Sequence, residues 1–534
     1  MRDLVCAVDV GTTSARAGIL DRTGALLARA EHPLRLSRPR PDHAEHDSED
    51  VWRAVCRAVA AARVKAGAGA ERVAAIAWDA TCSLVVRGEQ GRQVSVSADG
   101  GPDEGPAGDG TCWDTMVWLD HRAMAEADDC TATGHRVLSH LGGVMSPEMQ
   151  TPKLMWLKRH RPDRWRDARL FFDLADFLSW RACGSTARSQ CTLTCKWTYL
   201  AHADGWQRDF FEGLGVGDLL EQGGLPARAT PVGTALGHLT ERAARELTLD
   251  TSCVVGAGLV DAFAGALGVV GGHAEGSDDR RAALITGTSS CITGFSRRPR
   301  SAPGVWGPYF GAVLPEHWLV ESGQSATGAL LDHVIQVFGG TPPSAAAHAA
   351  IIARITAMRR DPDADLGRDL HILPDFHGNR SPFADPHARG VISGLTLDSS
   401  FDGLCRVYWR TAVAIALGVR HILEGLADHG YPIDALHVAG GHSRNPLLME
   451  LYADATKAAI HETTAADAVL SGTAMVAATA AGWYGSLAES ARAMQQPCHR
   501  RAANPASAAG YERDYRIFRR MHAHRLELQE LGRG

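Results

Sequence analysis

An acidic residue followed by small hydroxyl residues stands near the start of the chain, and this combination suits a metal-bound phosphate. Asp9 ends an apolar stretch, and the next stretch begins after Gly11, Thr12, Thr13 and Ser14. N–H groups in such a turn form an anion-binding concavity, and a carboxylate beside them can hold hydrated Mg²⁺ against phosphate oxygens. We therefore predict a β-hairpin over residues 5–20 whose tip binds phosphate beside Asp9. An ordinary hairpin turn is the alternative.

The same plan recurs about half a chain later. Residues 283–295 again form an apolar stretch, a tip with Gly287, Thr288 and Ser289, and a second apolar stretch. One such turn would be weak support for a site, because ordinary hairpins share it. Two at this separation indicate two similar domains, each directing a phosphate-binding hairpin toward a shared cleft.

A single acid, Asp261, begins an almost uncharged helix after the strand and Gly-Ala-Gly turn of residues 254–258. Acids are seldom buried among apolar neighbours without a role. The turn imitates part of a dinucleotide fingerprint, but Asp261 stands where the third glycine would be, which argues against that use. A carboxylate here could instead accept a proton from a substrate hydroxyl that attacks phosphorus.

Two clusters of polar residues, at 78–85 and 117–122, stand where predicted strands end. The second cluster places Trp118 beside an acid, an imidazole and a guanidinium. It suits a polyhydroxylated ligand, because each hydroxyl donates and accepts while the indole covers a C–H face. A plain turn explains the first cluster equally well, and a buried salt bridge explains the second. Lys196 stands beside Trp197, and a lone lysine there is more often a snorkelling surface residue than a ligand.

Two further segments in the second half have the composition of ligand sites. Glu321 and Gln324 stand where a predicted strand meets a helix start. Residues 436–446 read as a strand, the pair Gly440 and Gly441, and a helix with Pro446 at its first position. Paired glycines let a flat ligand lie against bare backbone, and the helix start favours phosphate, so we predict the adenosine site of a nucleotide here. A structural tight turn is the alternative.

The elements that position these residues follow from periodicity. Helices are expected over residues 47–67, capped by Asp47 or Ser48, over 152–160, 173–180 and 403–430, and in a charged terminal segment from about residue 505. Residues 73–77 read as a buried strand, and residues 88–115 as an irregular surface loop. The uncharged run 468–488 is expected to be an interior helix rather than a membrane span.

The overall composition limits the class of protein. A chain of 534 residues is too long to fold around a single hydrophobic core, so we expect two domains, at residues 1–270 and 271–534. The net charge is −6 and basic residues are scattered, so neither nucleic acid nor a membrane is an expected partner. The twelve cysteines lack a paired framework and no leader pattern begins the sequence, which predicts reduced thiols in a cytoplasmic protein.

Taken together, these motifs resemble the FGGY carbohydrate kinases, which have the actin-like ATPase fold. The resemblance covers nearly the whole chain and rests on the Asp9 hairpin, the Gly258-x-x-Asp261 segment, the second hairpin tip and residues 439–443, all in family order and spacing. Residues 79–85, 118–122 and 194–197 resemble the pentulose kinase branch of the family. Within that branch, the Thr-Cys-Ser-Leu-Val stretch is similar to the D-ribulokinase members.

The resemblance implies a role for each motif. Asp261 would be the catalytic base, and Asp9 and Asp261 would hold Mg²⁺ through water. The sugar would contact Thr81, Cys82, Trp118, Asp120, His121, Arg122, Lys196, Asp261 and Glu321. ATP would contact Gly11, Thr12, Thr13, Ser14, Gly287, Thr288, Ser289, Gln324, Gly440, Gly441, Ser443 and Asn445. Ala439 departs from the glycine of many relatives, which is tolerable if its dihedral angles are ordinary, and the 88–115 loop is longer and more irregular than expected.

We therefore expect an α/β chain with two actin-like (ribonuclease H-like) ATPase domains, a ligand cleft between them, and ATP and Mg²⁺ as cofactors. The expected reaction phosphorylates the terminal hydroxyl of a ketopentose, D-ribulose giving D-ribulose 5-phosphate. The alternatives are a kinase for L-ribulose, xylulose, ribitol or a heptulose, and a non-catalytic nucleotide-dependent binding protein on the same fold. A homodimer is left open, because a twofold interface cannot be located in one sequence.

Overall fold

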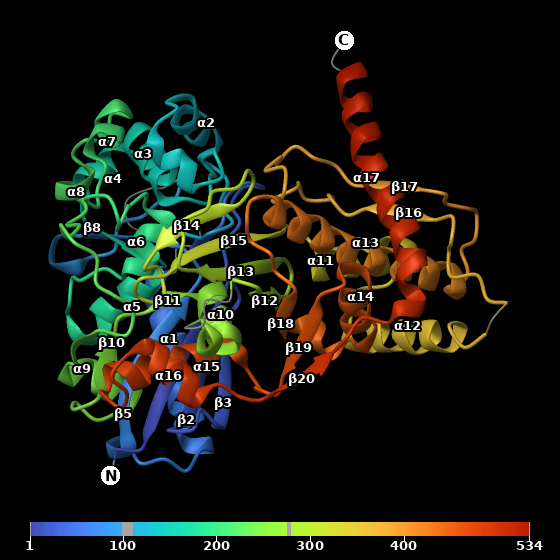
Figure 1. The fold of residues 1–534 in the computed structure, drawn as a ribbon. Helices are drawn as coiled ribbons and strands as arrows, with labels where there is room; N and C mark the ends of the chain where they lie inside the picture. The colour runs from blue at the N-terminus through green and yellow to red at the C-terminus, as the bar shows by residue number, and fades with distance from the viewer. Residues whose placement is uncertain (1, 99–110, 275–278, 362, 533–534) are drawn as a thin grey trace.

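Two seven-stranded sheets organise the chain, of which the computed structural model describes residues 2–98, 111–274, 279–361 and 363–532. The first sheet has the order β3-β2-β1-β5-β10-β9, with β11 also paired to β5, and the second has the order β14-β15-β13-β12-β18-β19-β20 (Figure 1). The strands of the first sheet are β1 Leu4–Val10, β2 Ser14–Asp21, β3 Leu26–Pro33, β5 Val73–Ala80, β9 Ala235–His238, β10 Val254–Gly256 and β11 Leu259–Val260. Those of the second are β12 Arg281–Thr286, β13 Ser290–Ser296, β14 Trp306–Phe310, β15 Trp318–Gln324, β18 Ala435–Gly440, β19 Ala459–Thr463 and β20 Cys498–Arg501.

The two sheets repeat one topology. Strand β1 pairs antiparallel with β2 and parallel with β5, and β2 pairs antiparallel with β3. Strand β12 likewise pairs antiparallel with β13 and parallel with β18, and β13 pairs antiparallel with β15. Both predicted hairpins are therefore confirmed, and each lies at the same place in its own α/β sheet.

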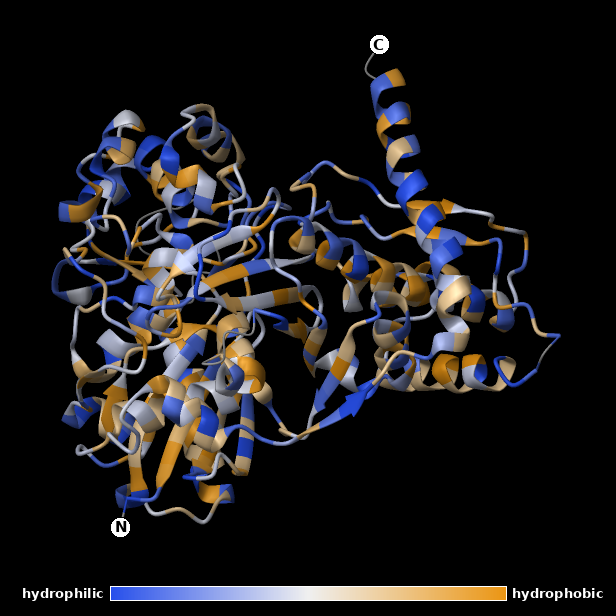
Figure 2. Ribbon diagram, in the orientation of Figure 1, coloured by the Kyte–Doolittle hydropathy of each residue, from blue (hydrophilic) through white to orange (hydrophobic). Residues whose placement is uncertain are grey.

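The helix α1 (Ser48–Lys65) packs against β2 and β3 as its sequence pattern predicts. Asp47 is the cap, since its carboxylate accepts the backbone N–H of Glu49 at 2.9 Å. The apolar stripe that includes Val51, Val55 and Val59 is buried. Hydrophobic residues also concentrate in the strands of the first sheet, against which this helix packs (Figure 2).

The uncharged run 468–488 forms an interior helix only in part. Helix α15 (Ala468–Ala480) lies against α10 (Asp261–Val270), and the chain turns before α16 (Leu487–Met494). Glycines permit this close contact, because a Cβ on Gly472 would collide with the carbonyl oxygen of Ala264. Both α15 and α16 pack beside the first sheet, although β20, which follows them, belongs to the second (Figure 1).

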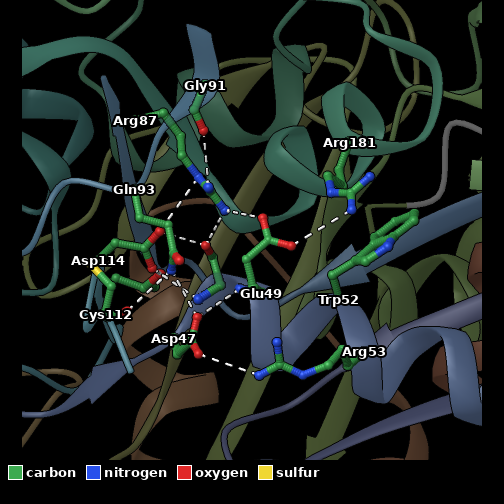
Figure 3. Close-up of polar contacts among 12 residues, drawn as sticks. Asp47, Glu49, Trp52, Arg53, Arg87, Gly91, Gln93, Cys112, Asp114 and Arg181 are labelled. Atoms are coloured by element: carbon green, nitrogen blue, oxygen red, sulfur yellow. Dashed lines mark hydrogen bonds and ion pairs between the residues drawn. The ribbon is translucent and has the colours of Figure 1, made fainter. Parts of the chain in front are cut away.

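The predicted 88–115 loop is anchored at both ends. Val94 and Val96 are buried, and Arg87 forms ion pairs with Glu49 at 2.9 Å and with Asp114 at 3.5 Å (Figure 3). Residues 94–97 and most of 111–115 are therefore buried and not at the surface as predicted, whereas Glu89, Gln90 and Arg92 are exposed. The segment joins two strands of a small sheet. The remainder of that predicted loop, residues 99–110, lies outside the described residues. The small sheet contains β4 Glu45–His46, β7 Thr115–Met116, β6 Leu84–Gly88 and β8 Ala168–Asp173.

The remaining helices cover the sheets and carry the connections. The predicted helix at 173–180 is α5, which begins one residue after β8 ends at Asp173. In the part of the chain that the structure describes, no helix is long and apolar enough to span a bilayer. The helices are α2 Met124–Ala132, α3 Gln150–His160, α4 Pro162–Asp167, α5 Leu174–Cys183, α6 Gln190–Lys196, α7 Arg208–Gly213, α8 Leu219–Gln222, α9 Glu241–Leu247, α11 Gly328–Gly339, α12 Ala345–Met358, α13 Phe401–Asp428, α14 Pro446–Thr456 and α17 Ala508–Leu531, and β16 His371–Leu373 pairs with β17 Val391–Ser393.

Candidate active site

A cavity of about 810 Å³ lies where the two hairpin tips meet. Its wall contains residues from both sheets, including the ends of β1, β12 and β18. It therefore has the position that two facing phosphate-binding hairpins require. The predicted site residues that line it are Asp9, Gly11, Thr12, Thr81, Cys82, Trp118, Lys196, Asp261, Gly287, Thr288, Ser289, Glu321, Gly440, Gly441 and Ser443.

Three predicted sugar ligands lie outside this cavity wall. Asp120 and Arg122 are buried and joined by an ion pair of 2.7 Å. The Arg122 guanidinium also donates to Glu45 at 2.8 Å, and Asp120 accepts the Ala44 N–H at 2.7 Å. This is the buried salt bridge that the sequence left as an alternative. His121 is partly exposed, with its Nε2 3.9 Å from a Glu148 carboxylate oxygen.

Four predicted nucleotide ligands also lie outside the wall. The Gln324 amide donates to the Ile415 carbonyl oxygen at 3.1 Å, and Asn445 caps α14. At the first hairpin, Thr13 is exposed, and Ser14 already begins β2. The polar groups of Gln324 and Asn445 thus serve the fold, because Gln324 joins β15 to α13 and Asn445 satisfies a backbone N–H at the start of α14.

Two carboxylates stand side by side where β1 and β5 reach the cavity, and Asp9 of the pair lines its wall. Asp9 and Asp79 are register partners on β1 and β5, and both are almost fully buried. Arg16 approaches Asp9 Oδ2 at 3.0 Å, and the Thr473 hydroxyl donates to Asp79. Burial raises the pKa of Asp9 to about 7 against the lowering effect of Arg16, and burial with Asp9 beside it raises the pKa of Asp79 well above its usual value.

This pair of carboxylates fits a bound cation. Apart from the Arg16 ion pair, Asp9 Oδ2 has no hydrogen-bond partner among the described residues, and Asp79 Oδ1 has none. Asp261 and Asp467 also line the cavity, and their charges raise the pKa of Asp9 further. Carboxylate oxygens are the ligands that Mg²⁺ prefers, and a cation would relieve this mutual repulsion.

Asp261 stands at the first position of α10, where β11 delivers it to the cavity. Its Oδ1 accepts the backbone N–H of Ala262 at 2.8 Å. Burial raises its pKa, with Glu321 raising it further and Lys196 opposing the shift. A carboxylate with a raised pKa at a cavity wall is suited to accept a proton from a hydroxyl.

A charged and aromatic cluster forms another part of the cavity wall. Lys196 is buried, so the surface alternative for it is wrong, and its Nζ lies 4.3 Å from the Trp306 ring centroid. The Arg380 guanidinium lies 5.0 Å from the same centroid, 3.4 Å from Glu321 and 3.9 Å from Glu148. Burial acts to lower the pKa of Lys196, but Cys82, Glu321 and Glu148 outweigh it, so the lysine stays cationic.

Sequence reasoning missed Glu148, Trp306 and Arg380. They lie in irregular segments or at a strand start, in no motif, and their meeting depends on how the two sheets pack. The only sequence signal is the isolation of single charges among neutral residues. Glu148 shows how strong the cluster is: burial would raise its pKa, but His121, Arg380 and Lys196 lower it to about 2.

The paired glycines at the end of β18 differ in what they allow. Gly440 has a φ of +97°, and a Cβ there would collide with the Thr286 carbonyl oxygen. Gly441 does not have a positive φ, and the nearest described atom to a Cβ there, outside its chain neighbours, is the Thr286 carbonyl oxygen at 3.9 Å. Ala439 does not have a positive φ either, so its departure from glycine costs no backbone strain.

Comparison with known proteins finds relatives over nearly the whole chain. Sequence models of the FGGY family of carbohydrate kinases match residues 4–91 and 111–268 for the N-terminal domain and residues 282–481 for the C-terminal domain. The chain is 40% identical, over 98% of both chains, to an FGGY carbohydrate kinase domain-containing protein of Danio rerio. It is 34% identical to a D-ribulokinase of Saccharomyces cerevisiae, over 84% of this chain and 68% of the other.

Solved structures show the same fold at lower identity. A ligand-bound xylulose kinase from Lactobacillus acidophilus has a TM-score of 0.80 at 19% identity, over 98% of both chains. A xylulose kinase from Rhodospirillum rubrum has a TM-score of 0.77 at 23% identity, again over 98% of both. These likenesses establish the two-sheet architecture.

Proposed function

Because the chain belongs to the FGGY family of carbohydrate kinases, which phosphorylate sugars with ATP, we propose that its sugar is D-ribulose and its product D-ribulose 5-phosphate. The observation that carries the proposal is the meeting of Asp261, Lys196 and Glu321 in one cavity with both hairpin tips. The D-ribulokinase relative supports the choice of sugar, since it matches most of both chains.

We assign the cavity two functional ends. The hairpin tips with Thr12 and Thr288 bind the phosphates of ATP through N–H and hydroxyl groups, and Gly441 leaves room for the nucleoside. The Lys196 and Glu321 side chains bind the sugar, because a cation and an acceptor together can fix the orientation of neighbouring hydroxyls. Closure of the two sheets around both ligands would exclude water and align the reacting atoms.

Asp261 is the proposed general base. Its carboxylate accepts the proton of the terminal sugar hydroxyl as that oxygen attacks the γ-phosphorus, and a base of this kind contributes about 10²–10⁴-fold to the rate. Asp9 and Asp261 would hold Mg²⁺ through water, and the ion would supply charge neutralisation for the phosphates. Arg16 keeps Asp9 oriented through the 3.0 Å ion pair.

The test is ADP release by the purified chain with MgATP and a panel of sugars. The panel contains D-ribulose, L-ribulose, xylulose, ribitol, a heptulose and glycerol. We expect D-ribulose to have the highest kcat/KM, by at least about tenfold, the discrimination that one lost hydrogen bond of about 1.4 kcal/mol produces. Phosphorus NMR should place the new phosphate on C5.

Two results would contradict the proposal in different ways. A higher kcat/KM for another sugar would retain the kinase and replace the substrate. No turnover with any member of the panel, while ATP still binds, would favour the non-catalytic binding protein. An Asp261→Asn variant serves as the matched control, because it removes the proposed base and keeps the side-chain volume.

A further inference from the structure

Two histidines and a cysteine meet on one face of the second sheet, and none of the three lines the cavity. His437 lies on β18 opposite His461 on β19, and Cys498 on β20 pairs with Thr463, which is on the same face as His461. The three strands lie side by side at one edge of the sheet (Figure 1). One possible ligand atom from each of the three residues lies within 4.8 Å of the others.

We propose that His437, His461 and Cys498 form a binding site for a divalent transition-metal ion of the Zn²⁺ type. Two imidazole nitrogens and a thiolate match the donors that Zn²⁺ selects over the oxygen ligands that Mg²⁺ needs. Three protein ligands leave one tetrahedral position for water. No catalytic role proposed above uses any of the three residues.

The distances support this assignment. Zn–N bonds of about 2.0–2.1 Å and Zn–S bonds of about 2.3 Å place neighbouring tetrahedral ligand atoms roughly 3.3–3.6 Å apart. His461 Nδ1 lies 3.4 Å from Cys498 Sγ, which already fits that spacing. The rings of His437 and His461 are stacked with centroids 4.5 Å apart and planes 10° from parallel. Because the lone pair of each ring nitrogen lies in the ring plane, at least one ring must rotate out of the stack before both nitrogens can bind one ion.

The surroundings keep the site accessible and its ligands available. Cys498 is the one exposed cysteine of the twelve, all of which lie in the described part of the chain. Arg281 Nη1 lies 3.4 Å from His437 Nε2, and an ion on that nitrogen would replace this contact.

The site stands apart from the proposed nucleotide site but on the same strands. Ala439 lies two residues after His437, and Thr463 lies two residues after His461. Both Ala439 and Thr463 line the cavity. An ion bound here would cross-link β18, β19 and β20 where they approach the nucleotide. The expected consequence is a more heat-stable protein in the presence of the ion, because only the folded chain brings the three ligands together.

The test uses Co²⁺ as a spectroscopic probe and Zn²⁺ as its competitor, with nucleotide-free protein. We expect a thiolate-to-cobalt charge-transfer band that saturates at one Co²⁺ per chain and that Zn²⁺ abolishes, whether or not further Co²⁺ binds near Asp9. Cys498→Ser should remove the band, and His461→Ala should weaken binding by at least about tenfold. His499→Ala is the matched control, because His499 pairs with Glu462 and points to the opposite face of the sheet.

A second measurement does not depend on variants. Zn²⁺ should slow the reaction of Cys498 with a thiol reagent in the native protein and raise its melting temperature, and Asp9→Asn should leave both effects unchanged. A Co²⁺ complex without the thiolate band would overturn the proposal. So would equal loss of binding in His499→Ala, or thiol labelling at an unchanged rate with Zn²⁺ present.

Discussion

Replacing either glycine of the Gly440 and Gly441 pair by alanine should have different consequences, because their backbones and surroundings differ. At Gly440, φ is +97° and ψ is −160°, and a Cβ would collide with the backbone of Thr286. At Gly441, the nearest described atoms to a Cβ, outside the chain neighbours, are the Thr286 carbonyl oxygen at 3.9 Å and Arg444 Nη2 at 4.0 Å. The fold itself excludes a side chain at Gly440 but leaves room for one at Gly441.

The magnitudes follow from these contacts. A non-glycine residue in that backbone region costs about 1–3 kcal/mol, and the collision adds to it, so Gly440→Ala should lower the free energy of unfolding by about 3 kcal/mol or more. Gly441→Ala should change it by no more than about 1 kcal/mol. However, Gly441 lines the cavity, and a methyl group against a bound nucleotide should raise the KM for ATP at least about tenfold, equivalent to about 1.4 kcal/mol.

The assay combines denaturant unfolding without nucleotide and steady-state ADP release with ATP varied at saturating sugar. Gly510→Ala is the control, because a Cβ at Gly510 has no described neighbour within 4 Å and α17 does not line the cavity. An unchanged KM for ATP in Gly441→Ala would refute the position given to the nucleotide. A Gly440→Ala protein as stable as the parent would refute the backbone argument.

Three further predictions concern the charged groups of the cavity. Asp261→Asn should reduce kcat by about 10²–10⁴-fold and leave the Kd for ATP, measured by calorimetry, within about threefold; a parental kcat would remove Asp261 as the base. Burial raises the pKa of Asp9 to about 7 while Arg16 lowers it, so protonation should reduce kcat/KM for ATP as the pH falls through about 7, and Arg16→Gln should move that fall to higher pH. A profile that stays flat between about pH 6 and 8 would contradict this assignment. Arg380→Met removes the partner that lies 3.4 Å from Glu321 and should raise the sugar KM at least about tenfold, as the loss of a charged hydrogen bond of about 1.5–3 kcal/mol implies, while the KM for ATP stays constant; equal changes in both KM values would point to general misfolding.

The elements that carry the site could be predicted from the sequence because local rules determine them. Alternating apolar residues around a Gly-Thr tip specify a hairpin wherever they occur, and the recurrence at Gly287 predicts a second domain of the same topology. Asp47 caps its helix through a contact two residues away. Gly440 needs a backbone conformation that few residues other than glycine adopt. The hairpins and the cap depend on near neighbours in the chain, whereas the collision that excludes a side chain at Gly440 is with Thr286, at the end of another strand.

Only the tertiary structure decides which residues line the cavity. Asp120 and Arg122 follow Trp118 by two and four residues. They nevertheless form a buried ion pair, while Trp118 lines the cavity. Thr473 donates to Asp79, which lies 394 positions away in sequence. Lys196 stays buried and charged because acids from separate segments surround it. Long-range electrostatics and burial depend on which strands and loops meet, and no local pattern in the sequence encodes that meeting.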